Sequence, residues 1–184
     1  MGVFVFGYGS LMWNPGFRHG GASPALLEGW RRAWCVRSTY YRGCERMPGL
    51  VLGLKRGGSC VGLLFEIPEE FASETLGALD EREMREHGYL RQTLSVLHAA
   101  GAAEAIAYTS EKLPDPHEDD IANAYRRARG FAGATSEYVE RTREFIRGMA
   151  VPAHWPAAHD GLPPGFSDSE TRSTDAYAYH CNRR

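Results

Sequence analysis

The chain has 184 residues, of which 43% are hydrophobic, and a formal net charge of −2 at pH 7. This length and apolar content are typical of one globular domain, with or without a tail. A charge so close to zero gives no electrostatic reason to expect nucleic acid or an anionic membrane as a partner. No run of the sequence approaches the roughly 18 apolar residues that a membrane-spanning helix needs.

The first expected element is a strand over residues 2–7 that leads into a Gly-Tyr-Gly-Ser turn. Phe4, Val5 and Phe6 make the strand apolar on both faces, which predicts burial. Gly7 and Gly9 allow unusual backbone angles and a close approach of a ligand to the main chain. Successive N–H groups in such a turn form an anion site, although a short glycine motif is also typical of a plain hairpin.

Residues 12–24 contain Pro and Gly and are expected to form a loop. Three strands are expected next, over residues 25–37, 49–55 and 60–67, with Arg42-Gly43 and Gly57-Gly58 as turns between them. A helix is expected from Pro68 to about His87, because Pro suits a first helical turn and Gly88 suits the position after the end.

The remainder predicts strands over residues 89–98 and 103–109, a helix over 117–129, and a helix from Thr135 or Ser136, either of which is a possible cap, to Met149. Periodicity is lost after residue 150, which predicts an extended or partly disordered tail over 151–184 beyond a domain of residues 1–150. Strands early and helices late favour an α+β fold, in which a mixed, curved or barrel-like sheet has helices packed outside.

The helix expected after Pro68 carries a carboxylate on its apolar face. At about 100° per residue, Glu83 lies in line with Ala72, Leu76 and Leu79. Burial there raises the pKa of a carboxyl group, as a general acid or base near neutral pH requires. Glu86 shares this face and is the second candidate. A purely structural ion pair is the alternative, with three possible partners: Arg82, Arg85 and Arg91.

Other kinds of site have weaker support in the sequence. Glu83 and His87 are spaced i, i+4, but no third metal ligand follows at a suitable spacing, so we expect no metal. Ser10 does not lie in a Gly-x-Ser-x-Gly elbow. No CxxC pair occurs among the four cysteines, and with no signal peptide apparent we expect reduced thiols in a cytoplasmic protein: Cys35, Cys44, Cys60 and Cys181.

Several blocks of the chain, in order, resemble the ChaC-like γ-glutamylcyclotransferases over roughly residues 2–150. The blocks are residues 4–11, 29–34, Ser38-Thr39, Arg42-Gly43, 48–54, 57–62, Arg82-Glu83-Met84, Gly88-Tyr89 and Tyr138. The resemblance implies a small mixed β-barrel with helices outside. The tail departs from the usual ending of this family.

The resemblance also implies a reaction. The free α-amine of a γ-glutamyl substrate attacks the substrate's own γ-carbonyl, 5-oxoproline forms, and an amine leaves. Glu83 is then the general acid and base, and no metal or organic cofactor is needed. The turn Tyr8-Gly9-Ser10-Leu11 would bind either the α-carboxylate or the oxyanion. The substrate implied for the ChaC branch is glutathione, which releases Cys-Gly.

Further site residues follow from the same resemblance. Ser38 and Tyr138 would add hydrogen bonds to the substrate, although a serine that faces solvent and a tyrosine that anchors a helix are equally open readings. Three residues would face the leaving dipeptide: Arg37, Tyr41 and Arg42. Two alternatives also stay open. One is a cyclotransferase for other γ-glutamyl amino acids or amines, and the other is a non-catalytic binding domain, against which the presence of Glu83 argues. The sequence does not predict an oligomeric state.

Overall fold

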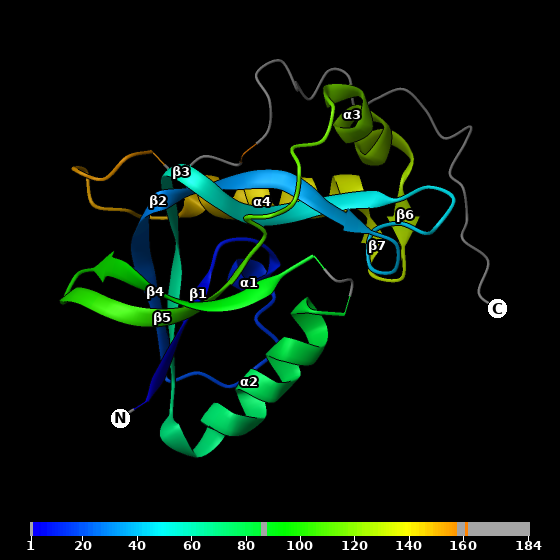
Figure 1. The fold of residues 1–184 in the computed structure, drawn as a ribbon. Coiled ribbons are helices and arrows are strands. Elements are labelled where there is room, and N and C mark those ends of the chain that lie inside the picture. The colour runs from blue at the N-terminus through cyan, green and yellow to red at the C-terminus, as the bar shows by residue number, and fades with distance from the viewer. Residues whose placement is uncertain (1, 86–87, 158–160, 162–184) are drawn as a thin grey trace.

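The structure is a computed structural model that describes residues 2–85, 88–157 and 161. Within these residues the chain forms a closed five-stranded barrel in the order β1-β3-β2-β4-β5, surrounded by four helices (Figure 1). The barrel strands are β1 (Val3–Gly7), β2 (Gly21–Ser38), β3 (Gly49–Ile67), β4 (Leu90–His98) and β5 (Gly101–Thr109). The predicted α+β fold with a mixed barrel is therefore confirmed.

β1 has a paired neighbour on each side in the barrel wall. It pairs antiparallel with β3, where Val3 lies opposite Ile67, and parallel with β5, where Phe4 lies opposite Ala105. The side chains of Val5 and Phe6 are fully buried, as an apolar strand with neighbours on both sides requires. The prediction of a buried first strand is confirmed.

β2 and β3 form one long antiparallel hairpin that continues past the barrel (Figure 1). The predicted break at Gly57-Gly58 is wrong, because β3 continues through it. Both glycines have positive φ, 95° and 76°, and the register shifts between Glu28 and Trp30 on the facing strand. The pair therefore makes a bulge that bends the ribbon without ending it. The predicted loop over residues 12–24 is also too long, since β2 begins at Gly21.

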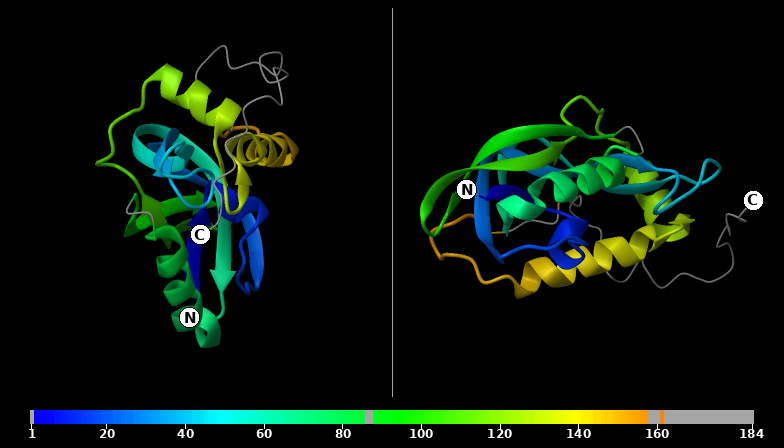
Figure 2. Two further views of the ribbon diagram at one scale, coloured as in Figure 1. Left: turned by 90° about the vertical axis from the view of Figure 1, so that its right-hand side faces the viewer. Right: turned by 90° about the horizontal axis from the view of Figure 1, so that it is seen from below.

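The helices are α1 (Ser10–Trp13), α2 (Glu69–Glu83), α3 (Glu118–Arg127) and α4 (Thr135–Gly148). Two two-residue strands that the sequence did not predict, β6 (Arg129–Gly130) and β7 (Gly133–Ala134), form a hairpin before α4. The last helix begins after Ala134, whose N–H donates to Glu137, so the predicted cap at Thr135 or Ser136 is wrong. Seen from below, α1 lies between α2 and α4 (Figure 2).

α2 ends at Glu83, four residues before the predicted end near His87. Its buried residues are Thr75 and Leu79, with Ala72 and Leu76 partly buried on the same side. The predicted apolar face is therefore confirmed, and Glu83 is its last residue. Glu86 and His87 lie outside the described residues.

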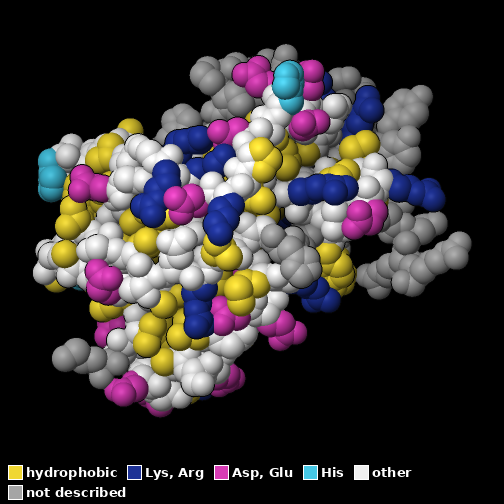
Figure 3. All heavy atoms as spheres, in the orientation of Figure 1, with side chains coloured by type: hydrophobic (Ala, Val, Ile, Leu, Met, Phe, Trp, Pro, Cys, Tyr) yellow, Lys and Arg dark blue, Asp and Glu magenta, His cyan; other side chains and the backbone are white. Residues whose placement is uncertain are grey.

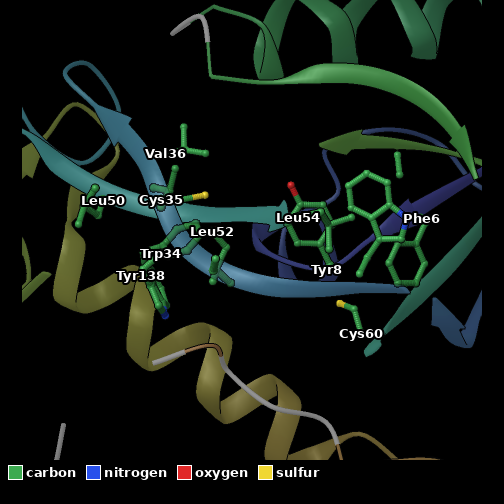
Figure 4. Close-up of a cluster of buried hydrophobic side chains, with 14 of the residues drawn as sticks. Phe6, Tyr8, Trp34, Cys35, Val36, Leu50, Leu52, Leu54, Cys60 and Tyr138 are labelled. Atoms are coloured by element: carbon green, nitrogen blue, oxygen red, sulfur yellow. The ribbon is translucent and has the colours of Figure 1, made fainter. Parts of the chain in front are cut away.

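The main core joins the barrel interior to the extended part of the β2–β3 hairpin. Figure 4 shows Tyr138 pointing from α4 toward Trp34 on β2, where the two rings make an edge contact with centroids 5.5 Å apart. Cys35 and Cys60 are free and buried, whereas Cys44 is disulfide-bonded, so the prediction of reduced thiols is wrong at Cys44.

None of the helices in the described part of the chain has the length and apolar character needed to cross a membrane. Residues 158–160 and 162–184 lie outside the described residues. The division into a domain of residues 1–150 and a tail of 151–184 therefore stays a prediction.

Candidate active site

A cavity of about 250 Å³ opens beside the start of α1, the end of α2 and the first turn of α4. Eleven residues line it: Ser10, Trp13, Asn14, Tyr41, Arg42, Val51, Arg82, Glu83, Tyr89, Ala132 and Tyr138. A narrow inner cavity of about 20 Å³ is lined by Glu83, Tyr89, Tyr138 and the turn Tyr8–Leu11, and by Leu52 and Tyr108. Ser10, Glu83, Tyr89 and Tyr138 border both spaces, so the two form one site with an inner end and a mouth.

The turn after β1 forms the wall of the inner end. The guanidinium of Arg32 donates to the carbonyl oxygen of Tyr8 at 2.6 Å, and the Tyr8 hydroxyl donates to the carbonyl of Tyr108 at 2.6 Å. A Cβ atom at Gly9 would lie 2.6 Å from the Tyr138 hydroxyl oxygen. Gly9 is therefore required for the close approach of α4, and the predicted turn residues Tyr8, Gly9, Ser10 and Leu11 do lie together at the cavity.

Glu83 lies where the inner end meets the mouth. Its side chain is 14% exposed, and its Oε1 atom is buried without a hydrogen-bond partner. Burial raises the pKa of Glu83 above its usual range, and the nearby charge of Arg82 lowers it in part. The position at the C-terminal end of α2 adds to the first effect, because the negative end of the helix dipole disfavours a carboxylate. A carboxyl group in this state can both accept and return a proton near neutral pH.

Arg82 connects α2 to the α1 segment. Its two Nη atoms donate to the Ser10 hydroxyl at 3.0 Å and to the carbonyls of Asn14 and Pro15 at 3.1 and 3.0 Å. Its Nε atom lies 3.1 Å from Glu83 Oε1 as an ion pair, in a geometry that does not make a hydrogen bond. Both expectations for Glu83 are thus met, since it is buried at a cavity and it also pairs with one of the three predicted arginines.

Tyr138 and Tyr89 complete the inner end. Burial and the neighbouring Glu83 raise the pKa of Tyr138 to about 12, although hydrogen bonds from the backbone of Ser10 and Leu52 act against this. Burial also raises the pKa of Tyr89 well above its usual range, and its hydroxyl donates to the carbonyl of Leu52. Both phenols therefore stay protonated at neutral pH, so that each remains a hydrogen-bond donor.

Arg42 brings positive charge to the mouth. Its guanidinium lies 5.4 Å from the ring centroid of Tyr138 and 6.0 Å from that of Trp13, and its Nη1 atom is 3.9 Å from Glu137. Burial lowers its pKa from an ordinary value so high that the group stays charged. A buried arginine whose acid partner in the described part of the chain is this distant is suited to bind a carboxylate.

Not every predicted residue lines the cavity. Ser38 is fully buried, and its hydroxyl accepts the N–H of Arg42 at 2.9 Å, so it supports the Arg42 turn from behind. Arg37 is exposed, pairs with Glu45, and lines a separate cavity on the other side of the hairpin. Tyr41 and Arg42 do line the mouth, and that they face the departing dipeptide stays a prediction. In the described part of the chain, no group of three or more His, Cys, Asp or Glu side chains is arranged to hold a metal.

Sequence reasoning did not single out Trp13, Asn14, Val51 or Ala132, and it named Tyr89 only within a block. Trp13 is held by its indole N–H, which donates to Thr142 Oγ1 at 3.1 Å across 129 residues of sequence. No local pattern signals such a contact. The one sequence feature that indicates Trp13 as a cavity residue is its position just after a glycine-rich turn, because large aromatic side chains commonly line ligand pockets.

Comparison with known proteins places this geometry in context. A family model described as "ChaC-like protein" matches residues 3–158. A glutathione-specific γ-glutamylcyclotransferase of Escherichia coli (strain K12) is 35% identical over 143 residues, which cover 74% of this chain and 62% of the relative. The chain thus spans less than two thirds of that relative. A mouse protein, glutathione-specific γ-glutamylcyclotransferase 1, is 29% identical over 155 residues, with 79% of this chain and 70% of the relative covered.

Two further proteins extend the comparison. γ-Glutamylcyclotransferase 2-3 of Arabidopsis thaliana is 29% identical, with 99% of each chain covered. A crystal structure of a selenomethionine-labelled yeast γ-glutamyl cyclotransferase specific to glutathione superposes with a TM-score of 0.75 at 19% identity, over 85% of this chain and 91% of that one. This likeness shows a common fold and confirms the predicted barrel type.

Proposed function

From the fact that this chain belongs to the ChaC-like protein family, we propose that it is a γ-glutamylcyclotransferase that cleaves glutathione into 5-oxoproline and Cys-Gly. Relatives named for this activity support the substrate. The observation that carries the proposal is the Oε1 atom of Glu83, buried at a cavity and without a hydrogen-bond partner. We further propose a cytoplasmic location, where glutathione is kept reduced, although a disulfide such as that of Cys44 is uncommon there.

In the proposed reaction the nucleophile is part of the substrate. The α-amine attacks the γ-carbonyl carbon, a new C–N bond closes the five-membered lactam, and the C–N bond to the cysteinyl nitrogen breaks. Glu83 takes a proton from the α-amino group and returns one to the departing nitrogen, so protons balance over the cycle. The remaining task of the protein is to hold the glutamyl chain bent, which exploits proximity.

The polar groups around Glu83 suit this role. The backbone of the Tyr8–Leu11 turn and the phenol of Tyr138 border the inner end, where hydrogen-bond donors would stabilise the carboxylate or the developing oxyanion. The Tyr89 hydroxyl donates to the carbonyl of Leu52 and so shapes the wall beside them. Arg42 at the mouth is suited to the carboxylate of the departing dipeptide. Ser38 is assigned a supporting role through Arg42 rather than a contact with substrate.

The test is to incubate the purified protein with reduced glutathione and measure 5-oxoproline and Cys-Gly by mass spectrometry. Glu83→Gln is expected to lower turnover by about 10²- to 10⁴-fold. Glu81→Gln is the matched control, because Glu81 lies on the same helix and is exposed. A protein that releases no 5-oxoproline from glutathione or from a panel of γ-glutamyl amides would point to the non-catalytic binding domain. Full activity in Glu83→Gln would remove Glu83 as the base.

A further inference from the structure

Exposed apolar side chains gather around the mouth of the cavity. Among the described residues five large hydrophobic side chains are exposed, and three of them are next in sequence to residues that line the mouth, Tyr41, Glu83 and Ala132: Tyr40 (38%), Met84 (38%) and Phe131 (68%). The other two, Leu90 and Leu97, lie on β4. In Figure 3, hydrophobic and basic side chains lie together on this side of the molecule, near the end of α2. Single exposed apolar residues are ordinary, but a cluster beside a cavity indicates a binding surface.

The cluster is continuous with the cavity wall. The rings of Tyr40 and Phe131 stack with centroids 5.3 Å apart, and the ring of Tyr40 makes an edge contact at 5.0 Å with Tyr41, which lines the cavity. Two backbone hydrogen bonds of 2.8 Å, from Phe131 to Tyr40 and from Ala132 to Tyr41, fix the two segments side by side. An apolar surface therefore runs without a gap from Tyr41 outward to Phe131. We call Tyr40, Met84, Arg85 and Phe131 the aromatic rim.

The rim is also fixed to the catalytic helix end. The guanidinium of Arg85 lies over the ring of Tyr40, 4.4 Å from its centroid, and Arg85 follows Glu83 by two residues. Tyr40 is thus held by Arg85, Tyr41 and Phe131. The ring of Phe131 in contrast stacks on Tyr40 and remains two-thirds exposed. A rigid apolar ring held at this place is available to cover part of a bound molecule.

The orientation of the substrate decides which part would meet the rim. This step rests on the proposed function. With the glutamyl group at Glu83 and the Tyr8–Leu11 turn, the departing half extends toward Tyr41, Arg42 and Ala132. In glutathione the departing half carries a thiol on a short side chain, which offers the rim almost no apolar surface. A group attached to that sulfur would offer such a surface.

We propose that the aromatic rim is a subsite for an apolar substituent on the departing half of the substrate, so that the enzyme also cleaves glutathione S-conjugates carrying aromatic or alkyl groups. The bonds made and broken are those of the glutathione reaction, with 5-oxoproline and the S-substituted Cys-Gly as products. Phe131 acts as a specificity-determining residue, because it touches the substituent and not the reacting atoms.

The test compares kcat/KM for S-benzylglutathione and for glutathione, both followed by release of 5-oxoproline. The parent protein should cleave both. In Phe131→Ser, kcat/KM for S-benzylglutathione should fall by about fivefold, since one aromatic contact is lost, while the value for glutathione stays within twofold. Phe131→Tyr should keep the parent ratio. Leu97→Ser is the control, because it removes another exposed apolar side chain, on β4, and should change neither value.

Four results would overturn the proposal. If the parent protein cleaves glutathione but not the conjugate, or if Phe131→Ser affects both substrates equally, the rim subsite fails and the proposed function stands. If Phe131→Ser abolishes a concentration-dependent association and leaves the kinetic ratio unchanged, the rim is a contact between proteins. Release of 5-oxoproline from neither substrate would remove the proposed function and the subsite together.

Discussion

The Nε atom of Arg82 lies 3.1 Å from Oε1 of Glu83, while the two Nη atoms of the same guanidinium hold Ser10, Asn14 and Pro15. One side chain therefore has two effects on the site. It lowers the pKa that burial has raised at Glu83, and it fixes the distance between the end of α2 and the turn after β1. The two effects are separable by substitution.

Arg82→Gln is expected to move the acidic limb of the pH profile of kcat/KM to higher pH. The positive charge of Arg82 favours the ionised form of Glu83, so its removal raises the pKa of the proposed base, and a higher pH is needed to ionise it. Arg82→Lys keeps the positive charge, so the acidic limb should lie at the same pH as in the parent protein. It should nevertheless lower Tm, because an ammonium group cannot make all the hydrogen bonds of the guanidinium. An unchanged limb in Arg82→Gln would contradict the electrostatic role. Arg56→Gln, a change at the surface, serves as control.

Glu83→Gln is expected to stabilise the fold at alkaline pH. Because burial raises the pKa of Glu83 in the folded state, the folded protein binds this proton more tightly than the unfolded chain does. Ionisation of Glu83 therefore lowers the free energy of unfolding. This loss is absent below the ordinary pKa of a glutamate and grows as the pH rises from there to the raised pKa of the folded state. Melting temperatures of parent and variant should therefore converge near pH 4 and separate toward pH 8. Glu81→Gln should show no such separation, and a separation that shrinks with rising pH would refute the argument.

Gly9→Ala is expected to lower the free energy of unfolding by about 1–3 kcal/mol, because the new methyl group would lie against the Tyr138 hydroxyl. In a Tyr138→Phe background the hydroxyl is gone and the cost of Gly9→Ala should be smaller. Denaturant unfolding of the four proteins in this cycle measures the coupling. If the changes in the free energy of unfolding caused by the two substitutions simply add, the methyl group does not clash with the hydroxyl, because the structure relieves the contact elsewhere.

The single variant Tyr138→Phe addresses a question that the sequence left open. Its ring contacts with Trp13 and Trp34 should persist, but the backbone N–H groups of Ser10 and Leu52 lose their acceptor. The free energy of unfolding should therefore fall by about 1–3 kcal/mol. If the hydroxyl donates to the substrate, kcat/KM should fall by about tenfold or more. Unchanged kinetics would leave Tyr138 as the anchor of α4 alone.

Ser38→Ala is expected to raise KM more than it lowers kcat. Its hydroxyl is the acceptor for the buried N–H of Arg42, and loss of such an acceptor costs about 1–3 kcal/mol of stability. Displacement of Arg42 would weaken binding of the departing half, as Arg42→Gln also should. A collapse of kcat with an unchanged Tm would instead show that Ser38 contacts the substrate.

Local sequence patterns predicted the parts of the site that depend on local geometry. The helical period placed Glu83 on the buried face, and the glycine-rich turn after an apolar strand marked the wall of the inner cavity. The end of α2 was placed four residues late, because Gly88 was taken as the glycine that follows a helix end. The bulge at Gly57-Gly58 was taken for a turn, because glycine pairs serve both purposes and only the facing strand distinguishes them.

Contacts that join distant segments were not predictable in this way. The clamp of Arg82 on Ser10 crosses 72 residues, and the hydrogen bond from Trp13 to Thr142 crosses 129. The approach of Tyr40 to Phe131 likewise depends on how the hairpin tip meets the short β6–β7 hairpin. Burial of Ser38 behind Arg42, rather than at the cavity, depends on the same packing.

The pairing of β1 on both sides has a consequence for how this site can change. The amide protons of Phe4 and Val5, which lie between β3 and β5, should exchange with solvent only when the whole barrel opens. The rim around Phe131 is joined to the barrel through short surface segments and should exchange by local opening. Substitutions that change which molecules bind can therefore accumulate at the edge of the cavity without unfolding the strand that leads into its inner end.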